Sequence, residues 1–455
     1  MSLTNASPLE VARAASVSGL ALARLDTSAR NAALTTVHAA LAGAKGVILE
    51  ANKKDLAAAN TAAENGQLSH SLVKRLDLGK PGKFDDMLQG ILDVRDLPDP
   101  IGRVTLRTEL DDGLILERVS CPIGVLLIIF EARPEVIANI ASLAIKSGNA
   151  AILKGGKEST ESFKAISTVI SEALKSTKVP NDAVQLVTTR DAIDPLLEQD
   201  RYINLVIPRG SNSLVRYIKD KTRIPVMGHA DGLCLTYLCS DADASSAAKV
   251  IVDAKTTYPA ACNSVETLLV DQDALSTILP TVASALQKSG VSLRCDPESK
   301  AALAGALEKH HAALLQDASD EDFDTEFLDL ILAIKTIPKG AGPEDALEQA
   351  VSHINTHGSH HTDAIITSSA ARAEKFMDAV DSAGVFWNTS TRLADGMRYG
   401  FGTEVGVSTN KIHARGPVGL EGLTVYKYKA RGSMQATADY GSAGKAWKHK
   451  RLALD

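Results

Sequence analysis

The sequence has 455 residues, which is too long for one compact core, so we expect at least two domains. Its 45% hydrophobic and 23% charged residues are ordinary for a globular protein, and abundant alanine with 4% aromatic residues favours α/β layers over a β-sandwich. The net charge of −6 argues against a general nucleic-acid-binding protein, because neutralising phosphates requires a basic face.

The cysteines and the start of the chain narrow the class further. The five cysteines are an odd number and include no CxxC pair, which argues against a disulfide framework and a structural zinc site. The first residues lack a basic stretch followed by an apolar one, and no apolar segment reaches the about 18 residues that a membrane helix requires. We therefore expect a cytoplasmic protein that binds neither membranes nor nucleic acids.

The first part of the chain is predicted to be helical and to lead into a β-hairpin. Residues 8–92 carry alanine-rich apolar repeats at helical spacing, with capping residues at 26–28. Residues 104–110 and 114–120 alternate like strands around the tight turn 111–113. A two-stranded hairpin is marginal in water, so we expect it to pair with another strand, in this chain or in a second copy.

A parallel sheet is predicted to follow the hairpin. Residues 122–130 are continuously apolar, as in a strand buried on both faces, and a helix and a second buried strand follow. This βαβ unit continues in a doubly wound pattern through three further strands, at residues 183–187, 203–207 and 233–238. A second α/β set follows the helix 244–255, with strands at residues 266–270, 291–293, 328–334, 364–367 and 384–388.

Two glycine-containing loops are candidates for a nucleotide site. Residues 154–157 and 208–211 each follow a buried strand and open a helix, where backbone N–H groups favour an anion. Either loop alone is better explained by solvated charges, but two on one sheet favour a nucleotide. The predicted cofactor-binding residues are Lys154, Gly155, Gly156, Lys157, Arg209, Gly210 and Ser211. The cationic Lys157 favours NADP(H), because a 2′-phosphate attracts a cation.

Cys262 is the candidate nucleophile. It follows Pro259 and two alanines and precedes a strand, a setting in which a loop thiol is accessible. The alternative is a small buried hydrophobe. Arg392 and Arg398 lie in a polar, glycine-rich segment, where they can either grip carboxylate or phosphate groups or form local ion pairs. The histidines at 353, 357, 360 and 361 match no established ligand pattern, so we predict no metal.

Taken in order, several blocks of sequence resemble the γ-glutamyl phosphate reductases of the aldehyde dehydrogenase superfamily. The likeness extends from near the start to about Tyr428. The blocks are FEARPEV, ILKGGKES, IPRGSNSLV, YPAACNSVETLLV, HGSHHTDAIIT and the long segment that begins FWNTSTRLADGMRYGFGTEVG.

The resemblance implies an aldehyde-dehydrogenase-like α/β fold, with two doubly wound domains and a β-hairpin extension for oligomerisation. The expected parts are a cofactor domain at 1–254, interrupted by the hairpin 102–120, and a catalytic domain at 255–418. The hairpin and residues 419–455 would form the oligomerisation strands and tail. The implied partners are further copies of the chain, as a dimer or larger homo-oligomer, and glutamate 5-kinase.

The resemblance also implies roles for individual residues. Cys262 falls on the nucleophile of the superfamily and Lys154 on its cofactor-binding lysine. Lys157 stands where NAD-preferring relatives often have an acid, and Glu326 where relatives place a glutamate near the nicotinamide ribose. The expected substrate-binding residues are Arg133, Asn263, Arg392 and Arg398.

The implied reaction is the NADPH-dependent reduction of L-glutamyl 5-phosphate to L-glutamate 5-semialdehyde and phosphate, the second step of proline synthesis. Oxidative aldehyde dehydrogenases carry a general-base glutamate about thirty residues before the cysteine, whereas this sequence reads GHADGLC there, with Asp231. The absence of that glutamate fits exchange of the thioester with phosphate instead of activated water. The alternatives are a non-phosphorylating or CoA-linked aldehyde dehydrogenase, and a non-catalytic scaffold for the kinase.

Overall fold

The computed structural model describes residues 2–68, 70–131, 133–189, 192–305, 314–340, 343–442 and 444–454. The chain divides into two compact units. Unit 1 comprises Met1–Met227, Gly400–Gly406 and Val418–Asp455, and unit 2 comprises Gly228–Tyr399 and Val407–Pro417.

Unit 1 is built on a five-stranded parallel sheet in the order β1-β6-β5-β4-β7. The strands are β1 (Ser2–Thr4), β4 (Val125–Phe130), β5 (Ala150–Gly155), β6 (Val184–Val187) and β7 (Leu205–Arg209). The predicted strands are confirmed, and β1 was not predicted. Strand order reverses at β4, since β5 and β6 extend the sheet on one side and β7 on the other, as in a doubly wound fold.

The helices of unit 1 include the predicted N-terminal set. The Asp26 side chain caps α2 by accepting a hydrogen bond from the Ala29 N–H, 2.7 Å away, which confirms the predicted cap. Apolar residues of α1, such as Val11, pack in one cluster with Leu127 and Ile129 of β4. The helices are α1 (Pro8–Leu22), α2 (Thr27–Gly43), α3 (Lys45–Glu64), α4 (His70–Leu76), α5 (Lys83–Asp96), α6 (Val136–Ser147), α7 (Thr160–Leu174), α8 (Ile193–Leu197) and α9 (Asn212–Lys221).

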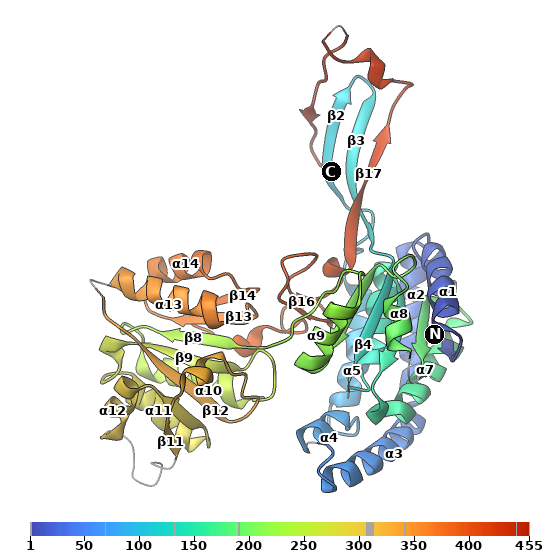
Figure 1. Ribbon diagram of the computed structural model, residues 1–455. Helices are drawn as coiled ribbons and strands as arrows, with labels where there is room; N and C mark the ends of the chain where they lie inside the picture. Colours follow the sequence, from blue (N-terminus) through green and yellow to red (C-terminus); the bar gives the residue numbers. More distant parts are fainter. Residues whose placement is uncertain are drawn as a thin grey trace. The chain divides into compact units, whose positions relative to one another are not determined.

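The predicted hairpin is confirmed and finds its partners within this chain. Strands β2 (Val104–Asp111) and β3 (Leu114–Pro122) join β17 (Thr424–Arg431) and β18 (Lys450–Arg451) in an antiparallel sheet, in the order β17-β3-β2-β18. Figure 1 shows β17 beside β3, although the two are far apart in sequence. The chain thus supplies the third strand that a hairpin in water needs.

Unit 2 is built on a seven-stranded parallel sheet in the order β11-β10-β12-β9-β8-β13-β14. Its strands are β8 (Cys234–Leu238), β9 (Val265–Asp271), β10 (Ser292–Cys295), β11 (Leu315–Asp317), β12 (Ile331–Ile337), β13 (Thr362–Ile366) and β14 (Gly384–Trp387). Its helices are α10 (Ala244–Thr256), α11 (Leu279–Lys288), α12 (Pro297–Ala304), α13 (Pro343–His357) and α14 (Ala370–Ala379).

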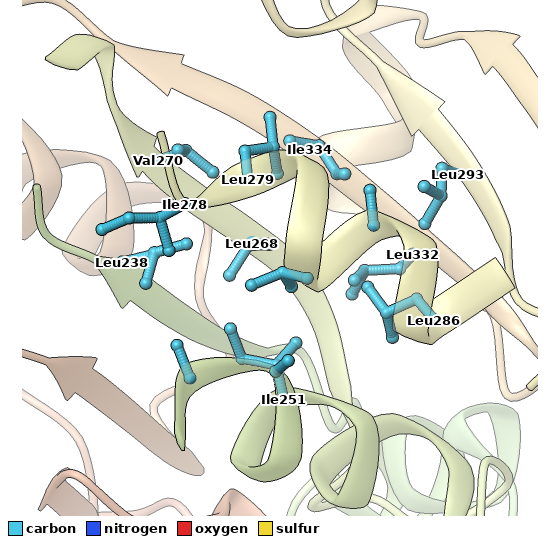
Figure 2. Close-up of a cluster of buried hydrophobic side chains, with 14 of the residues drawn as sticks. Leu238, Ile251, Leu268, Val270, Ile278, Leu279, Leu286, Leu293, Leu332 and Ile334 are labelled. Atoms are coloured by element: carbon cyan, nitrogen blue, oxygen red, sulfur yellow. The ribbon is translucent and has the colours of Figure 1, made fainter. Parts of the chain in front are cut away.

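Helices cover both faces of this second sheet. Successive side chains of a strand point to opposite faces, so neighbouring residues of β9 pack against different helices. Leu268 and Val270 of β9 pack with residues of α10 and α11, including Ile251 and Leu279, as Figure 2 shows. The intervening Leu269 packs on the other face, in a cluster with residues of α13 and α14. This burial on both faces explains the apolar run of residues 268–270 in β9.

The division between the units differs from the predicted boundary near residue 255. Strand β8 and helix α10 belong to unit 2, because β8 pairs with β9 on one side and with β13 on the other. Residues 400–406, predicted in the catalytic domain, belong to unit 1, where the Val405 N–H donates to the Val418 carbonyl. A strand run alone does not reveal which of two sheets it joins.

Within the described residues, no single helix is both long and apolar enough to cross a membrane. The pair α2 and α3, bent by 67°, would pass by length and composition only.

Candidate active site

Four neighbouring strands of unit 2 bring functional side chains to one edge of the sheet. Glu326, Cys262, His229 and His361 each lie just before a strand, namely β12, β9, β8 and β13 respectively. These strands are adjacent in that order and all parallel, so their amino ends share an edge. The sheet order therefore gathers residues that are as much as 132 positions apart, from residue 229 to residue 361.

Cys262 lies between two histidines. Its Sγ atom and one ring nitrogen each of His229 and His361 all lie within 4.8 Å of one another. The two imidazole rings meet edge to face, with centroids 5.2 Å apart. Cys262 is half-buried, whereas His361 is only 1% exposed. Residue 262 is thus partly exposed, while one of its neighbours is fixed inside the protein.

Hydrogen bonds orient both imidazoles. His229 Nδ1 lies 3.1 Å from the Val407 carbonyl oxygen, which can only accept, so Nδ1 carries the proton and Nε2 is left for Cys262. His361 Nδ1 lies 2.9 Å from the hydroxyl of Thr362. The Nε2 atom of His361 is buried and has no hydrogen-bond partner among the described residues.

These contacts favour a thiolate. Burial raises the pKa of the Cys262 thiol, but the charges of His361 and His229 and the hydrogen bond of His229 outweigh burial and hold this pKa well below its ordinary value. Burial lowers the pKa of His229, but the Cys262 sulfur, the Val407 carbonyl and Glu326 outweigh it and raise the pKa to about 9. Near neutral pH the pair is therefore a thiolate beside an imidazolium, the reactive form of cysteine.

The loop before β8 approaches the backbone of Cys262 closely. A Cβ atom on Gly232 would lie 2.5 Å from the Cα atom of Cys262 and 2.3 Å from its carbonyl oxygen, so only glycine fits. The buried Cys234 thiol donates a hydrogen bond to the same carbonyl, over 3.4 Å. The GHADG segment therefore packs closely against the backbone of the nucleophile and also supplies His229.

Glu326 belongs to the same cluster. Burial and the Cys262 sulfur raise the pKa of its carboxyl group to about 7, against a hydrogen bond from the Gly232 backbone that lowers it. The structure thus places Glu326 near the nucleophile, and its contact with a cofactor ribose stays a prediction.

Asn263, Arg392 and Arg398 lie together in unit 2. The Asn263 amide donates to the Ala394 carbonyl over 2.8 Å, and its side-chain oxygen accepts from the Arg392 guanidinium. Asn263 therefore positions Arg392, and its contact with a substrate stays a prediction. Arg392 stacks on the Tyr258 ring, 5.8 Å from its centroid, and its buried Nε has no hydrogen-bond partner among the described residues. Arg398 is exposed and donates to the Arg392 carbonyl, 2.6 Å away.

A cavity of about 740 Å³ in unit 1 contains the predicted cofactor loop. Lys154, Gly155, Gly156, Lys157 and Glu158 line it, at the carboxyl end of β5. Burial lowers the pKa of the Lys154 amine, although the charge of Glu158 opposes this. Lys157 is exposed at the cavity. The charged residues Glu131 and Lys164 also line it, but most further lining residues are apolar, including Ile129, Phe130, Leu186, Val187, Ile193 and Leu214.

The glycines of this loop are dictated by close packing. A Cβ atom on Gly155 would lie 2.2 Å from the ring of Phe163. The Gly156 N–H donates to the Phe130 carbonyl over 2.8 Å, which ties the loop to β4. One carboxylate oxygen of Glu158 is buried without a hydrogen-bond partner among the described residues. Apolar walls, a lysine and an unpaired acceptor fit a nucleotide, whose hydroxyl groups can donate to that oxygen.

The second predicted loop differs from expectation. The Ser211 N–H, at the start of α9, donates to a carboxylate oxygen of Glu131 over 3.0 Å. A Cβ atom on Gly210 would lie 2.5 Å from the same oxygen. Arg209, Gly210 and Ser211 do not line the cavity. In this structure the helix end thus holds a carboxylate of the protein itself, and the role of Arg209, Gly210 and Ser211 in cofactor binding stays a prediction.

Arg133 belongs to unit 1, where its carbonyl accepts a hydrogen bond from the Val136 N–H at the start of α6. Its contact with a substrate stays a prediction.

The sequence did not single out His229 as functional, and it singled out His361 only within a histidine cluster. The signal for His229 was its position in GHADGLC, where oxidative relatives carry a glutamate. His361 could have been found from its place directly before a strand. Neither signal reveals that both side chains meet Cys262, because that depends on the order of strands in the sheet.

Comparisons with known proteins place the chain among related enzymes. The aldehyde dehydrogenase family model matches residues 97–321. A probable gamma-glutamyl phosphate reductase of Schizosaccharomyces pombe is 55% identical, over 95% of both chains. The gamma-glutamyl phosphate reductase of Saccharomyces cerevisiae is 50% identical, over 98% of both. The crystal structure of gamma-glutamyl phosphate reductase from Thermotoga maritima has 35% identity and a TM-score of 0.85, and the match covers 95% of this chain and 100% of that one.

Proposed function

Because the chain belongs to the γ-glutamyl phosphate reductases of the aldehyde dehydrogenase family, we propose that it reduces L-glutamyl 5-phosphate to L-glutamate 5-semialdehyde with NADPH, releasing phosphate. In this role it performs the second step of proline synthesis. The observation that carries the proposal is the half-buried Cys262 between His229 and His361, whose pKa is held low enough for a thiolate.

The first step is an acyl transfer to sulfur. The Cys262 thiolate attacks the carbonyl carbon of the acyl phosphate, a C–S bond forms, and the bond from carbon to the phosphate oxygen breaks. Phosphate leaves and a thioester remains on Cys262. The Cys262 backbone N–H is the candidate donor to the oxyanion that develops on the carbonyl oxygen. The positive charge of His229 also favours an anionic acyl phosphate beside the sulfur.

The second step returns the sulfur to its initial state. When bound, the nicotinamide cofactor supplies a hydride that reduces the thioester carbon to the aldehyde level. The C–S bond then breaks, the semialdehyde leaves, and Cys262 becomes a thiolate again, stabilised by His229 and His361. Glu326 has a pKa near 7, so this carboxyl group can hold a proton close to the sulfur at neutral pH.

The cavity of unit 1 is the candidate site for the cofactor. Lys154 would hold the nucleotide, and Glu158 offers its unpaired oxygen to a hydroxyl group. Family membership supports a nicotinamide cofactor. The exposed cation of Lys157 favours NADPH over NADH, because it can pair with the 2′-phosphate.

Arginines supply the recognition of an anionic substrate. Arg392 lies beside Asn263, the residue that follows the nucleophile, and Arg398 contacts Arg392. Together with Arg133 they are candidates for the phosphate and the α-carboxylate of the substrate.

Assembly and location are further parts of this proposal. The four-stranded antiparallel sheet of unit 1 ends in β17, whose Tyr426 and Tyr428 are 54% and 58% exposed. Exposed aromatics on an edge strand favour pairing with another copy, so we infer a homo-oligomer. A cytoplasmic location and a complex with glutamate 5-kinase, which makes the unstable substrate, complete the proposal.

The test is an assay in the reverse direction. The purified chain is given glutamate 5-semialdehyde and NADP, with and without inorganic phosphate, and reduced cofactor is followed by absorbance. Phosphate-dependent reduction of NADP is expected, and its loss in Cys262→Ala but not in Cys121→Ala, a second half-buried cysteine. Equal rates with and without phosphate would favour a non-phosphorylating enzyme. Activity that requires CoA in place of phosphate would favour a CoA-linked enzyme. No activity at all would favour a scaffold for the kinase.

A further inference from the structure

Three side chains at the nucleophile form an arrangement that also suits a metal ion. His229, Cys262 and His361 each offer one ligand atom, and these atoms lie within 4.8 Å of one another. A thiolate with two imidazoles is a ligand set that binds Zn²⁺ in proteins, where three protein ligands leave a fourth position open. No metal was predicted from the sequence, because the spacing of the histidines near residue 360 was judged without Cys262.

The geometry needs only a small adjustment to hold the ion. With Zn–S near 2.3 Å and Zn–N near 2.0–2.1 Å, the ligand atoms of tetrahedral zinc lie roughly 3.3–3.6 Å apart. The observed separations of at most 4.8 Å therefore require shifts of about 1 Å, within reach of small side-chain rotations.

A second observation points to a missing ligand. His361 is 1% exposed, and its Nε2 atom is buried without a hydrogen-bond partner among the described residues. Its other nitrogen is held by the Thr362 hydroxyl, 2.9 Å away. A buried polar atom without a partner is costly, and coordination of a cation would satisfy it.

The second imidazole is held in the same way. His229 Nδ1 is fixed by the Val407 carbonyl, 3.1 Å away, so a bound cation would replace the proton on Nε2. Such outer hydrogen bonds orient the histidines of metal sites and increase metal affinity. The Nδ1 atoms of both histidines are therefore held by hydrogen bonds, one to a carbonyl and one to a hydroxyl group.

We propose that His229, Cys262 and His361 bind one thiophilic divalent cation, Zn²⁺, which inhibits the enzyme reversibly. The ion coordinates the sulfur lone pair that attacks the acyl phosphate, so a metal-bound enzyme cannot form the thioester. The inhibitory half of this proposal rests on the proposed function of Cys262, whereas the binding half rests on geometry alone.

Binding is tested without reference to activity. The chain is stripped with a chelator, and Co²⁺ is added as a spectroscopic substitute for Zn²⁺. A thiolate-to-cobalt charge-transfer band is expected at one equivalent, and added Zn²⁺ should remove it by competition. The band should be lost in Cys262→Ser and in Cys262→Ala. His361→Ala should weaken Zn²⁺ binding, followed by calorimetry, by at least about tenfold.

The matched control is His357→Gln. His357 lies close to His361 in the sequence, but its ring contacts Asp324 and not Cys262. This variant should leave both the band and the Zn²⁺ affinity unchanged. Circular dichroism of each variant separates loss of ligand from loss of fold, and the two cysteine variants provide independent tests. A Co²⁺ band that survives both of them, or no uptake by the folded wild-type chain, would overturn the site.

Inhibition is tested separately, by comparing the reductase activity of the metal-free chain with that of the chain loaded with one equivalent of Zn²⁺. Loss of activity with Zn²⁺ and full recovery with a chelator are expected. Unchanged rates in a chain shown by calorimetry to hold one equivalent would overturn the inhibitory role. An inactive metal-free chain that still gives the cobalt band would instead refute the proposed reductase function and leave the binding site standing.

Discussion

The His229 Nδ1 atom lies 3.1 Å from the Val407 carbonyl oxygen, and this contact decides which nitrogen is available to Cys262. A carbonyl accepts and never donates, so the imidazole presents Nε2 to the sulfur. Val407 and His229 both belong to unit 2 but lie far apart in the sequence. A late segment of the chain therefore determines which ring nitrogen of His229 faces Cys262.

Replacing His229 should change how the reactivity of Cys262 depends on pH. In the wild-type chain the pKa of Cys262 is held well below its usual value, so its alkylation by iodoacetamide should vary little between pH 7 and 8.5. In His229→Ala the thiol loses one of the two groups that lower its pKa, and the thiolate should disappear as the pH falls. We expect alkylation at pH 7 to slow by about tenfold or more.

The control for that measurement is His413→Ala, an exposed histidine of the same unit. Mass spectrometry assigns the alkylated cysteine. A profile of His229→Ala that stays as flat as that of the control would show that His229 does not set the charge of the sulfur.

Gly232→Ala should disable the enzyme more than it destabilises the protein. The added methyl group would lie within 2.5 Å of the Cys262 backbone, so the loop or the nucleophile has to move. We expect kcat/KM to fall at least about a hundredfold, because small displacements of reacting groups are costly. Thermal unfolding should indicate a loss of roughly 1–3 kcal/mol.

Gly305→Ala is the matched control, because its added methyl would meet nothing within 4 Å among the described residues. It should keep near-normal activity and stability. Similar activity of the two alanine variants would contradict the close approach of Gly232 to Cys262.

Reversing the charge at Lys157 should change the preference between cofactors. Lys157→Glu removes one cation at the cavity and adds a carboxylate, which repels a 2′-phosphate and can accept hydrogen bonds from ribose hydroxyls. The ratio of kcat/KM for NADPH to that for NADH should fall at least tenfold. Lys175→Glu, at the far end of α7 and paired with Glu172, should leave the ratio unchanged. An unaltered ratio in Lys157→Glu would remove the basis for NADPH.

The buried pair of Lys255 and Glu266 should be sensitive to loss of one partner. Their charged atoms lie 2.6 Å apart, and both side chains are fully buried. Lys255→Met leaves Glu266 without its counter-ion and should destabilise the protein by about 3–5 kcal/mol. In Lys255→Met/Glu266→Gln much of this loss should be recovered, as measured by urea unfolding. A double variant no more stable than the single one would show that the charge of Glu266 is not the cause.

Prediction from sequence succeeded where local pattern determines structure. Strand β4 is buried on both faces and therefore has a continuously apolar sequence, and the turn at Gly113 marks the hairpin. Cys262 stood out because proline and small residues precede it. The sequence could not reveal its two histidines, because ligand sites of parallel sheets are expected at the carboxyl ends of strands. In unit 2 the cluster lies at the amino ends.

A second limit of prediction from sequence concerns the source of a charge. The loop before α9 has the composition of an anion site, and the structure places an anion there, but that anion is the side chain of Glu131. Composition gives the charge that a helix start attracts and not its source. Only the pairing of β4 with β7, which brings Glu131 beside Ser211, distinguishes an internal carboxylate from a ligand.

The sheet formed by β2, β3, β17 and β18 joins segments that the ribosome produces at very different times. The hairpin emerges while most of the chain is still unmade, and β17 follows only after all of unit 2 has been translated. Nascent chains must therefore keep an unpaired strand edge from aggregating throughout synthesis, and premature termination before residue 424 would leave that edge permanently open.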